Sequence, residues 1–203
     1  MQYIYFLLVV AAAYVIGSIP TGYLIVKHFK GIDIRETGSG STGATNVKRV
    51  MGTKWFFIVL FLDAMKGLIP VLISKYLEVR FNILLSWHIL PVAVSVAVIL
   101  GHSKSLFLGF SGGKSVASGV GTILGLNWIA GMAIAVIWSV IAYFSRYISL
   151  ASIIALLLAP VAMWVCKQPK SYIIYCALGA LYIVWLHRSN ILRLIKGEEN
   201  KVR

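Results

Sequence analysis

Acidic side chains are scarce in this chain, which has only 6 Asp and Glu residues against 19 Lys and Arg among its 203 residues. Only 12% of the residues are charged and 60% are hydrophobic, whereas a soluble domain has about 25% charged residues. This balance excludes an ordinary soluble domain. The shortage of carboxylates also leaves no Asp or Glu pair to hold a metal ion, so the sequence predicts neither a metal site nor a cofactor.

Cysteine is rarer still. Cys166 and Cys176 are the two thiols, and their spacing matches no metal-binding or redox motif. We interpret them as packing residues and leave open whether they pair. The sequence also has no His-Glu-x-x-His motif and no defensible Ser-His-Asp arrangement, which argues against metalloprotease and serine hydrolase chemistry.

Long apolar runs dominate the chain instead. A helix needs about 20 residues to cross roughly 30 Å of hydrocarbon, and Lys and Arg collect on the cytoplasmic side of a membrane. Seven spans with the N-terminus outside place most Lys and Arg in the cytoplasm, whereas merging 116–144 into one span loses this asymmetry. We therefore predict a single all-α polytopic membrane domain over 1–203, with its C-terminus cytoplasmic. The seven predicted spans are 3–26, 55–76, 87–101, 116–126, 128–144, 148–166 and 172–186.

The net charge of +13 needs no nucleic acid to explain it. Cytoplasmic retention of Lys and Arg, and their attraction to anionic lipid headgroups, account for a basic membrane protein. The predicted partner is therefore the lipid bilayer, with no nucleic acid.

The polar residues gather in three segments, which this topology places on the cytoplasmic face. The first is GSGSTGATNVKR, residues 38–49. Its glycines allow consecutive N–H groups to turn toward an anion, its hydroxyls add donors, and arginine can hold phosphate through two bonds. A flexible linker is the alternative, but the density of donors favours a phosphate site. The candidate residues are Ser39, Gly40, Gly43, Thr45, Asn46 and Arg49.

The second segment, GHSKSLFLGFSGGKSVAS at 101–118, repeats this chemistry. Gly112 and Gly113 precede Lys114 where the fourth span begins, so phosphate could approach free backbone N–H groups while the lysine neutralises it. The pattern is not a nucleotide P-loop, because Leu108 stands where that motif needs glycine. Gly101 and His102 are further binding candidates.

The third segment is the tail HRSNILRLIKGEE, residues 187–199. His187 and Asn190 share a helical face by their spacing, so they can reach one ligand together. Arg188 is a further binding candidate. Within the second span, Asp63 and Lys66 lie one helical turn apart, and we expect a supporting ion pair because buried charges are costly alone.

These segments resemble the three cytoplasmic motifs of the bacterial acyl-phosphate:glycerol-3-phosphate acyltransferases, the PlsY family. The resemblance extends to FLDAMKG (61–67) and SRYISLAS (145–152) and covers nearly the whole chain. Several positions depart from the family pattern, namely Ser41, Ser105, Ser111, Ser189 and Leu192.

The resemblance implies transfer of a fatty acyl group from acyl phosphate, rather than acyl-CoA, to the sn-1 hydroxyl of glycerol 3-phosphate, in the bacterial inner membrane, by an enzyme that we expect to act as a monomer. We expect Arg49, with His187 and the first segment, to hold glycerol 3-phosphate, and Lys114 to hold acyl phosphate. The general base stays open between the phosphate of the acceptor substrate and His187. A transporter for an anionic metabolite is the alternative function.

Overall fold

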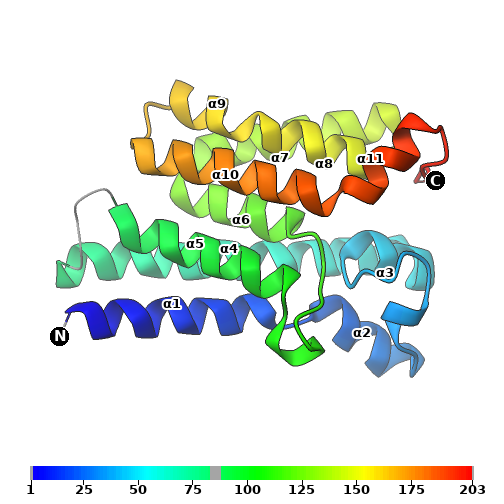
Figure 1. The fold of residues 1–203 in the computed structure, drawn as a ribbon, viewed down its shortest axis with the longest axis horizontal. Helices are drawn as coiled ribbons and strands as arrows, with labels where there is room; N and C mark the ends of the chain where they lie inside the picture. Colours follow the sequence, from blue (N-terminus) through cyan, green and yellow to red (C-terminus); the bar gives the residue numbers. More distant parts are fainter. Residues whose placement is uncertain (1, 83–87, 203) are drawn as a thin grey trace.

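The computed structural model describes residues 2–82 and 88–202 (Figure 1). Helices make up the fold, and within these ranges the extended structure is a single bridge between Ser105 and Ser111. The α-helices are α1 (Gln2–Ser18), α2 (Thr21–Lys30), α3 (Ala44–Met51), α4 (Thr53–Phe81), α5 (Ile89–Ser103), α6 (Val116–Leu126), α7 (Trp128–Ser145), α8 (Ile148–Leu157), α9 (Ala159–Val165), α10 (Lys170–Leu186) and α11 (Arg188–Ile195), and the short 3₁₀ turns include η1 (Ile34–Glu36) and η3 (Leu106–Leu108).

Four continuous or nearly continuous helical units are long and apolar enough to cross a bilayer. They are Gln2–Lys30, Thr53–Phe81, Trp128–Ser145 and Ile148–Val165, and the bent pair α10 and α11, which meet at 63°, raises the count to five. α5 and α6 are shorter, and the 11 residues of α6 extend only roughly 16 Å. The seven-span arrangement therefore remains a prediction, and residue 87, where the third predicted span begins, lies outside the described residues.

The merged span over 116–144 is wrong. α6 ends at Leu126 and α7 begins at Trp128, and the two helices pack against each other. Asn127 separates them, and its side chain accepts a hydrogen bond of 2.9 Å from the Ala130 N–H, which caps the first turn of α7. The chain reverses direction at this single polar residue, so the sequence on its two sides looks like one continuous apolar run.

The first apolar run is also broken, between α1 and α2. Proline cannot donate a backbone hydrogen bond, so Pro20 interrupts the helical pattern, and the Ile19 carbonyl is used by the Lys66 ammonium instead, at 2.8 Å. Beyond the break, α2 continues toward the end of the bundle that carries α3 and the C-terminus (Figure 1). It thereby brings the first polar segment to that end.

Close helix contacts depend on glycine. A Cβ atom on Gly67 of α4 would lie 2.2 Å from the Ser118 carbonyl oxygen, and one on Gly121 of α6 would lie 2.0 Å from the Ala64 carbonyl oxygen. Such distances are far inside van der Waals contact, so α4 and α6 can approach this closely only without side chains at these positions. The contact holds the second polar segment, which leads into α6, beside α4.

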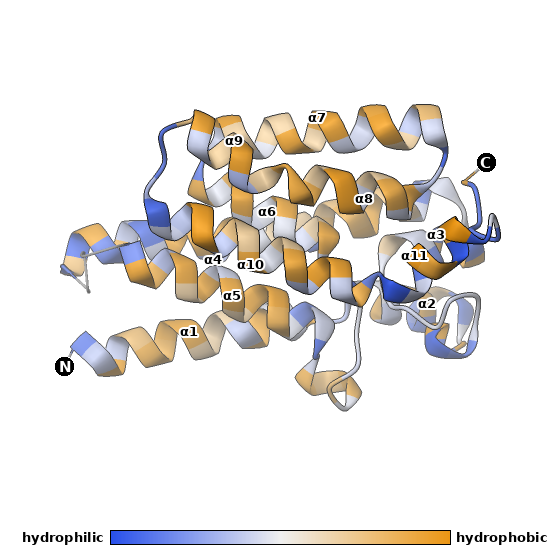
Figure 2. Cartoon of the chain, turned by 45° about the horizontal axis from the view of Figure 1, so that its top comes forward, coloured by the Kyte–Doolittle hydropathy of each residue, from blue (hydrophilic) through white to orange (hydrophobic). Residues whose placement is uncertain are grey.

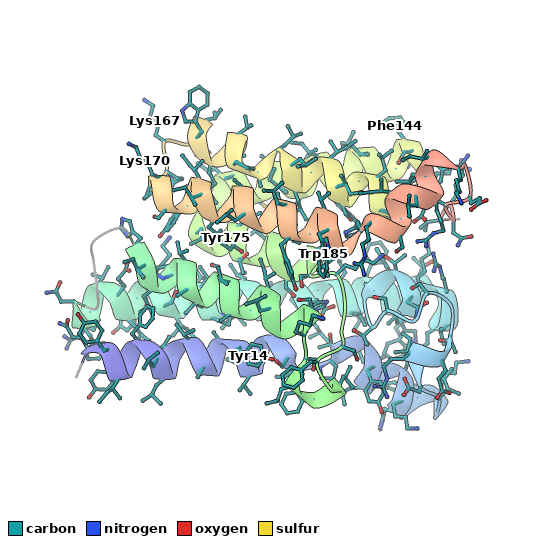
Figure 3. All side chains as sticks on the ribbon, viewed as in Figure 1. Tyr14, Phe144, Lys167, Lys170, Tyr175 and Trp185 are labelled. Carbon is teal, nitrogen blue, oxygen red and sulfur yellow. The ribbon has the colours of Figure 1, made fainter. Side chains whose placement is uncertain are left out.

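Polar residues collect at the two ends of the bundle, while the lengths of the helices are apolar (Figure 2). The N-terminus lies at one end, and α3, α11 and the C-terminus lie at the other (Figure 1). Lys167 and Lys170 lie at the end of the bundle opposite Phe144 (Figure 3). Cys166 and Cys176 are both free, so the structure has no bond between them.

We predict that Gly67→Ala destabilises the protein by about 1–3 kcal/mol, because the added methyl group must push α4 and α6 apart. Gly179→Ala is the matched control in α10, since its Cβ would meet no atom within 4 Å, and alanine favours a helix over glycine. Thermal unfolding in detergent measures both. Equal melting temperatures for the two variants would contradict the close-contact account.

Candidate functional site

One cavity of about 110 Å³ is lined by parts of all three polar segments. It lies at the end of the bundle where α3, α11 and the C-terminus meet (Figure 1). Residues far apart in the sequence thus face one space. The predicted residues that line it are Ser39, Gly43, Thr45, Asn46, Arg49, Asp63, His102, Lys114, His187 and Asn190.

The first segment is held in shape by Asn46, which is 1% exposed. Its side-chain amide donates to the carbonyl oxygens of Ile34, Thr37 and Ser41 at 3.2, 3.0 and 2.9 Å. Its carbonyl oxygen accepts from the Ser39 N–H at 3.1 Å. We predicted that Asn46 binds substrate, but these bonds occupy the side chain, so its observed contacts organise the loop.

The glycines of the first segment have two different uses. Gly38 and Gly40 adopt φ values of 58° and 68°, in the left-handed region that glycine enters without strain. Gly43 instead directly precedes α3 and lines the cavity. Gly40 was a binding candidate, but the structure uses it to turn the loop, and it does not belong to the cavity lining.

Within the second segment, Gly112 and Gly113 pack against His102. The Gly113 N–H donates to the His102 carbonyl oxygen at 3.1 Å. A Cβ atom on Gly113 would lie 2.1 Å from His102 Nε2, and one on Gly112 would lie 2.2 Å from the His102 carbonyl oxygen. Both glycines therefore permit close packing. The Gly113 amide, which we predicted as a phosphate donor, is already engaged within the protein.

Lys114 extends from this loop into the cavity, where its ammonium contacts Asn190 Oδ1. Burial lowers the pKa of Lys114 to about 8, and the neighbouring Arg193 and Arg49 lower it further, while Glu199 opposes them. The side chain is therefore a cation at neutral pH that is close to losing its proton. Such a group gains from an anionic ligand, which would replace the solvation it has lost.

The tail contributes more than the two residues predicted there. Glu199 accepts hydrogen bonds from Asn190 Nδ2 at 2.6 Å, Arg193 Nε at 2.7 Å and Ser149 Oγ at 2.9 Å. Burial would raise the pKa of Glu199, but these three donors outweigh it together, so the pKa lies below its ordinary value. Glu199 is thus negatively charged, and it ties the end of the tail to Ser149 of α8 and to Asn190 and Arg193 of α11.

Sequence reasoning did not select Arg193, Glu199 or Ser149, although all three line the cavity. The available signal was the shortage of acid, because Glu199 is one of only 6 Asp and Glu residues and stands close to a run of basic residues. A carboxylate among cations predicts a structural counter-charge, and Glu199, next to Glu198 in the chain, has that role here.

His187 is 3% exposed and lines the cavity. Its Nδ1 lies 2.8 Å from the Ile183 carbonyl oxygen, which can only accept a hydrogen bond. In the neutral ring the proton therefore sits on Nδ1, and Nε2 remains an acceptor. This tautomer is the one that a general base or a hydroxyl-binding group requires.

Two predicted binding residues lie elsewhere. Arg188 donates to the Trp185 carbonyl oxygen at 3.2 Å, and its guanidinium lies 4.7 Å from the centre of the Trp185 ring. A Cβ atom on Gly101 would lie 2.4 Å from the Tyr14 carbonyl oxygen, so Gly101 allows α5 to pack on α1. Neither residue is part of the cavity lining.

The ion pair expected within the second span is present. Lys66 Nζ lies 2.8 Å from Asp63 Oδ1, with side-chain exposures of 7% and 2%. Asp63 also accepts a hydrogen bond from the hydroxyl of Thr21. The pair lies beside the cavity, which Asp63 lines.

Comparisons with known proteins identify the family of the chain. The family model for glycerol-3-phosphate acyltransferase matches residues 7–197. A glycerol-3-phosphate acyltransferase of Trichormus variabilis is 46% identical, over 96% of this chain and 90% of the relative, and one of Desulforamulus reducens is 43% identical, over 100% and 98%. The chain belongs to the glycerol-3-phosphate acyltransferase family.

Two crystal structures share the fold. Both are of PlsY (YgiH), an integral membrane glycerol 3-phosphate acyltransferase, and both are 36% identical to this chain. The match to the glycerol 3-phosphate form has a TM-score of 0.88 and covers 98% of this chain and 96% of the crystallised chain. The match to the lysophosphatidic acid form has a TM-score of 0.86 and covers 98% of this chain and 95% of the crystallised chain. With its apolar helices, this chain is a multi-pass integral membrane protein.

We predict that Asn46→Asp unfolds the first segment locally. The aspartate keeps the shape of asparagine but places an oxygen among three carbonyl oxygens, which removes the two N–H donors that these oxygens share and adds repulsion of roughly 1–3 kcal/mol. Limited proteolysis between residues 36 and 44 should become faster than in the wild type. Ser41→Ala, which removes only the 3.3 Å bond from the Gly43 N–H, is the control, and equal cleavage rates in all three proteins would contradict this role of Asn46.

Proposed function

We propose that this protein transfers a fatty acyl group from acyl phosphate to the sn-1 hydroxyl of glycerol 3-phosphate, releasing lysophosphatidic acid and inorganic phosphate. The observation that carries the proposal is the convergence of the three polar segments on one cavity. Family membership and the likeness to PlsY structures in glycerol 3-phosphate and lysophosphatidic acid forms support the acceptor and the product. A mixed anhydride donor is already activated, so its transfer requires chiefly positioning and charge stabilisation from the protein.

The cations divide naturally between two phosphate groups. Arg49 belongs to α3, beside the hydroxyls of Ser39 and Thr45 that also line the cavity, and this set would bind the phosphate of glycerol 3-phosphate. Lys114 reaches the cavity from the second loop, and it would stabilise the acyl phosphate and its departing phosphate. Because Asn190 contacts both Lys114 and Glu199, its part in this scheme is to orient the lysine.

The acyl chain needs an apolar continuation of the same cavity. Phe56 and Leu60 of α4 and Trp138 of α7 supply it, because they line the cavity beside the charged residues. Trp138 Nε1 donates to Ser152 Oγ at 3.1 Å, which satisfies its polar atom within the bundle and leaves the ring face apolar. The tail of the donor would therefore extend between α4 and α7 toward lipid.

Transfer requires a base for the sn-1 proton. The phosphate of glycerol 3-phosphate can accept it, since the second pKa of a phosphate monoester is about 6, and Arg49 would hold that phosphate in the cavity near the reacting hydroxyl. The second candidate is His187, whose Nε2 is the free acceptor in the neutral ring. We favour the substrate phosphate, with His187 binding the acceptor.

The membrane arrangement that fits this reaction has seven spans, with the N-terminus outside and the cavity facing the cytoplasm of a bacterium, at its inner membrane. The excess of basic residues near the cavity supports this orientation, and the completeness of the cavity within one chain supports a monomer. A transporter of anions is a weaker candidate, because it needs a central site open to both sides, whereas these cations gather at one end of the bundle.

The proposal is tested by incubating the purified protein with acyl phosphate and glycerol 3-phosphate and measuring released phosphate and lysophosphatidic acid. We expect both products in equal amounts with acyl phosphate and neither with acyl-CoA. Omission of glycerol 3-phosphate controls for simple hydrolysis. Phosphate release that does not require glycerol 3-phosphate would refute acyl transfer.

We predict that Lys114→Ala lowers kcat/KM by about 10²–10³, because it removes the cation at the leaving phosphate. In the wild type, kcat/KM should fall as pH rises through about 8, where the free Lys114 loses its charge. In Lys114→Arg the residual activity should decline only at higher pH, since arginine stays charged. Identical alkaline midpoints in the two proteins would show that another group titrates.

For the base, we predict that His187→Gln raises KM for glycerol 3-phosphate more than it lowers kcat, because glutamine can still accept a hydrogen bond but cannot take up a proton. Initial rates over a range of acceptor concentrations separate the two constants. Loss of turnover with unchanged acceptor binding would instead make His187 the base.

A further inference from the structure

A cluster of buried polar groups packs against the loop of residues 109–115, which carries Lys114 and is called the Lys114 loop below. Asp63 and Lys66 come from α4 and His102 from the end of α5, and the three residues are 2%, 7% and 8% exposed. The Lys66 ammonium has three N–H donors. They face Asp63 Oδ1 at 2.8 Å, the Ile19 carbonyl oxygen at 2.8 Å and His102 Nδ1 at 3.3 Å.

This arrangement fixes the tautomer of His102. An ammonium can only donate, so Nδ1 accepts from Lys66, and the proton of the neutral ring lies on Nε2. Ser118 Oγ, from the first turn of α6, is also 3.3 Å from Nδ1. The ring is therefore held from one side by α4 and α6, and its other edge, which carries Nε2, is directed at Gly113.

The Lys114 loop rests on this ring. Gly113 lies so close to Nε2 that a Cβ atom would be 2.1 Å away, and its N–H donates to the His102 carbonyl oxygen at 3.1 Å. Immediately after Lys114, Ser115 is fully buried and donates to the Ile99 carbonyl oxygen at 2.8 Å. The backbone on both sides of Lys114 is thus seated on the last turns of α5.

The cluster reaches the break between α1 and α2 as well. Asp63 accepts from the Thr21 hydroxyl, and Lys66 donates to the Ile19 carbonyl, so residues on both sides of Pro20 are tied to α4. One ion pair therefore joins the bend in the first helical unit, α4, the end of α5 and the start of α6. Among the described residues, the hydrogen bonds and ion pairs of this cluster do not include Lys114, and the connection passes through His102 and Gly113.

We propose that Asp63, Lys66 and His102 are positioning residues that set where the Lys114 ammonium lies in the cavity. The ion pair orients the imidazole, the imidazole supports Gly113, and Gly113 fixes the backbone that carries the lysine. His102 was expected to bind substrate, but its two ring nitrogens are directed at Lys66 and at Gly113. The kinetic consequences rest on the proposed acyl transfer, whereas the placement of Lys114 does not.

The experiment measures Lys114 directly, without substrate. The purified protein is labelled with trace amounts of an amine reagent across a range of pH, and mass spectrometry gives the midpoint at which Lys114 becomes reactive. The charged groups that face Lys114 are Arg49 from α3 and Arg193 and Glu199 from the tail, with His187 nearby, and all of them are unchanged in the variants.

Three variants disturb the cluster in different ways. His102→Leu removes the acceptor for Lys66. The double variant Asp63→Asn with Lys66→Met removes both charges together, so that neither is left unpaired. Gly113→Ala disturbs the contact from the loop side. In each, we expect the Lys114 midpoint to rise toward that of an exposed lysine, and kcat/KM to fall by about 10²-fold through misplacement of the cation. His102→Asn, which keeps an acceptor near Lys66, should restore part of both.

Glu78→Gln is the matched control. Glu78 is also a buried acid of α4, 2% exposed and 3.1 Å from His88 Nδ1, but it lies near the other end of that helix. The Glu78→Gln substitution should lower the melting temperature without changing the Lys114 midpoint or kcat/KM. A shift of the midpoint in this control equal to that in the cluster variants would reduce the effect to general loss of stability and overturn the proposal.

The remaining outcomes are equally decisive. Folded His102→Leu with the wild-type Lys114 midpoint overturns the proposal, and if that variant fails to fold, an unchanged midpoint in Gly113→Ala does so. If the midpoints shift as expected but the wild type transfers no acyl group, the positioning role stands and the proposed function fails.

Discussion

The contact of Lys114 with Asn190 joins two parts of the chain that approach the cavity from different helices, and the rest of the site depends on it. Asn190 in turn donates to Glu199, which also holds Arg193 and Ser149. Asp63, the other carboxylate that lines the cavity, is paired with Lys66, so Glu199 supplies the counter-charge to Lys114, Arg49 and Arg193. Without it, mutual repulsion of Lys114, Arg49 and Arg193 in a partly buried space would oppose closure of the site.

An excess of positive charge is then available to ligands. Glu199 neutralises one of these three cations, so the cavity retains an attraction for anions, and burial strengthens this attraction because there is less water to screen the charges. The depressed pKa of Lys114 has the same origin. The arrangement is suited to two phosphate groups that must be held near each other while one of them departs.

Much of this could be predicted from the sequence. Hydropathy indicated helices, the three polar segments were visible as interruptions of apolar sequence, and their resemblance to one family is confirmed by the family model and the fold. The break at Asn127 followed from the distribution of charge, and the ion pair of Asp63 and Lys66 from the cost of burying either residue alone. Each of these inferences uses a property that is local in the chain.

The contacts that the sequence could not predict are those that the folded loops make with their own backbone and with other segments. The sequence shows that Asn46 and Gly113 are polar-loop residues, but it cannot show that Ile34, Thr37 and Ser41 use up the amide of Asn46 or that His102 takes the Gly113 N–H. The same applies to Glu199, whose return to α8 requires the tail to fold back over the cavity. The polar groups of a short segment can bind either a ligand or the protein's own backbone, and only the fold decides between these roles.

The central claim is that three separated segments form one binding site for phosphate esters. Hydrogen–deuterium exchange of the detergent-solubilised protein, measured by mass spectrometry with and without glycerol 3-phosphate, tests it most directly. The account predicts slower exchange in residues 38–49, 112–118 and 187–199 at the same ligand concentration, with little change near Lys167 and Lys170 at the other end of the bundle. Protection confined to one of the three segments would contradict a shared site.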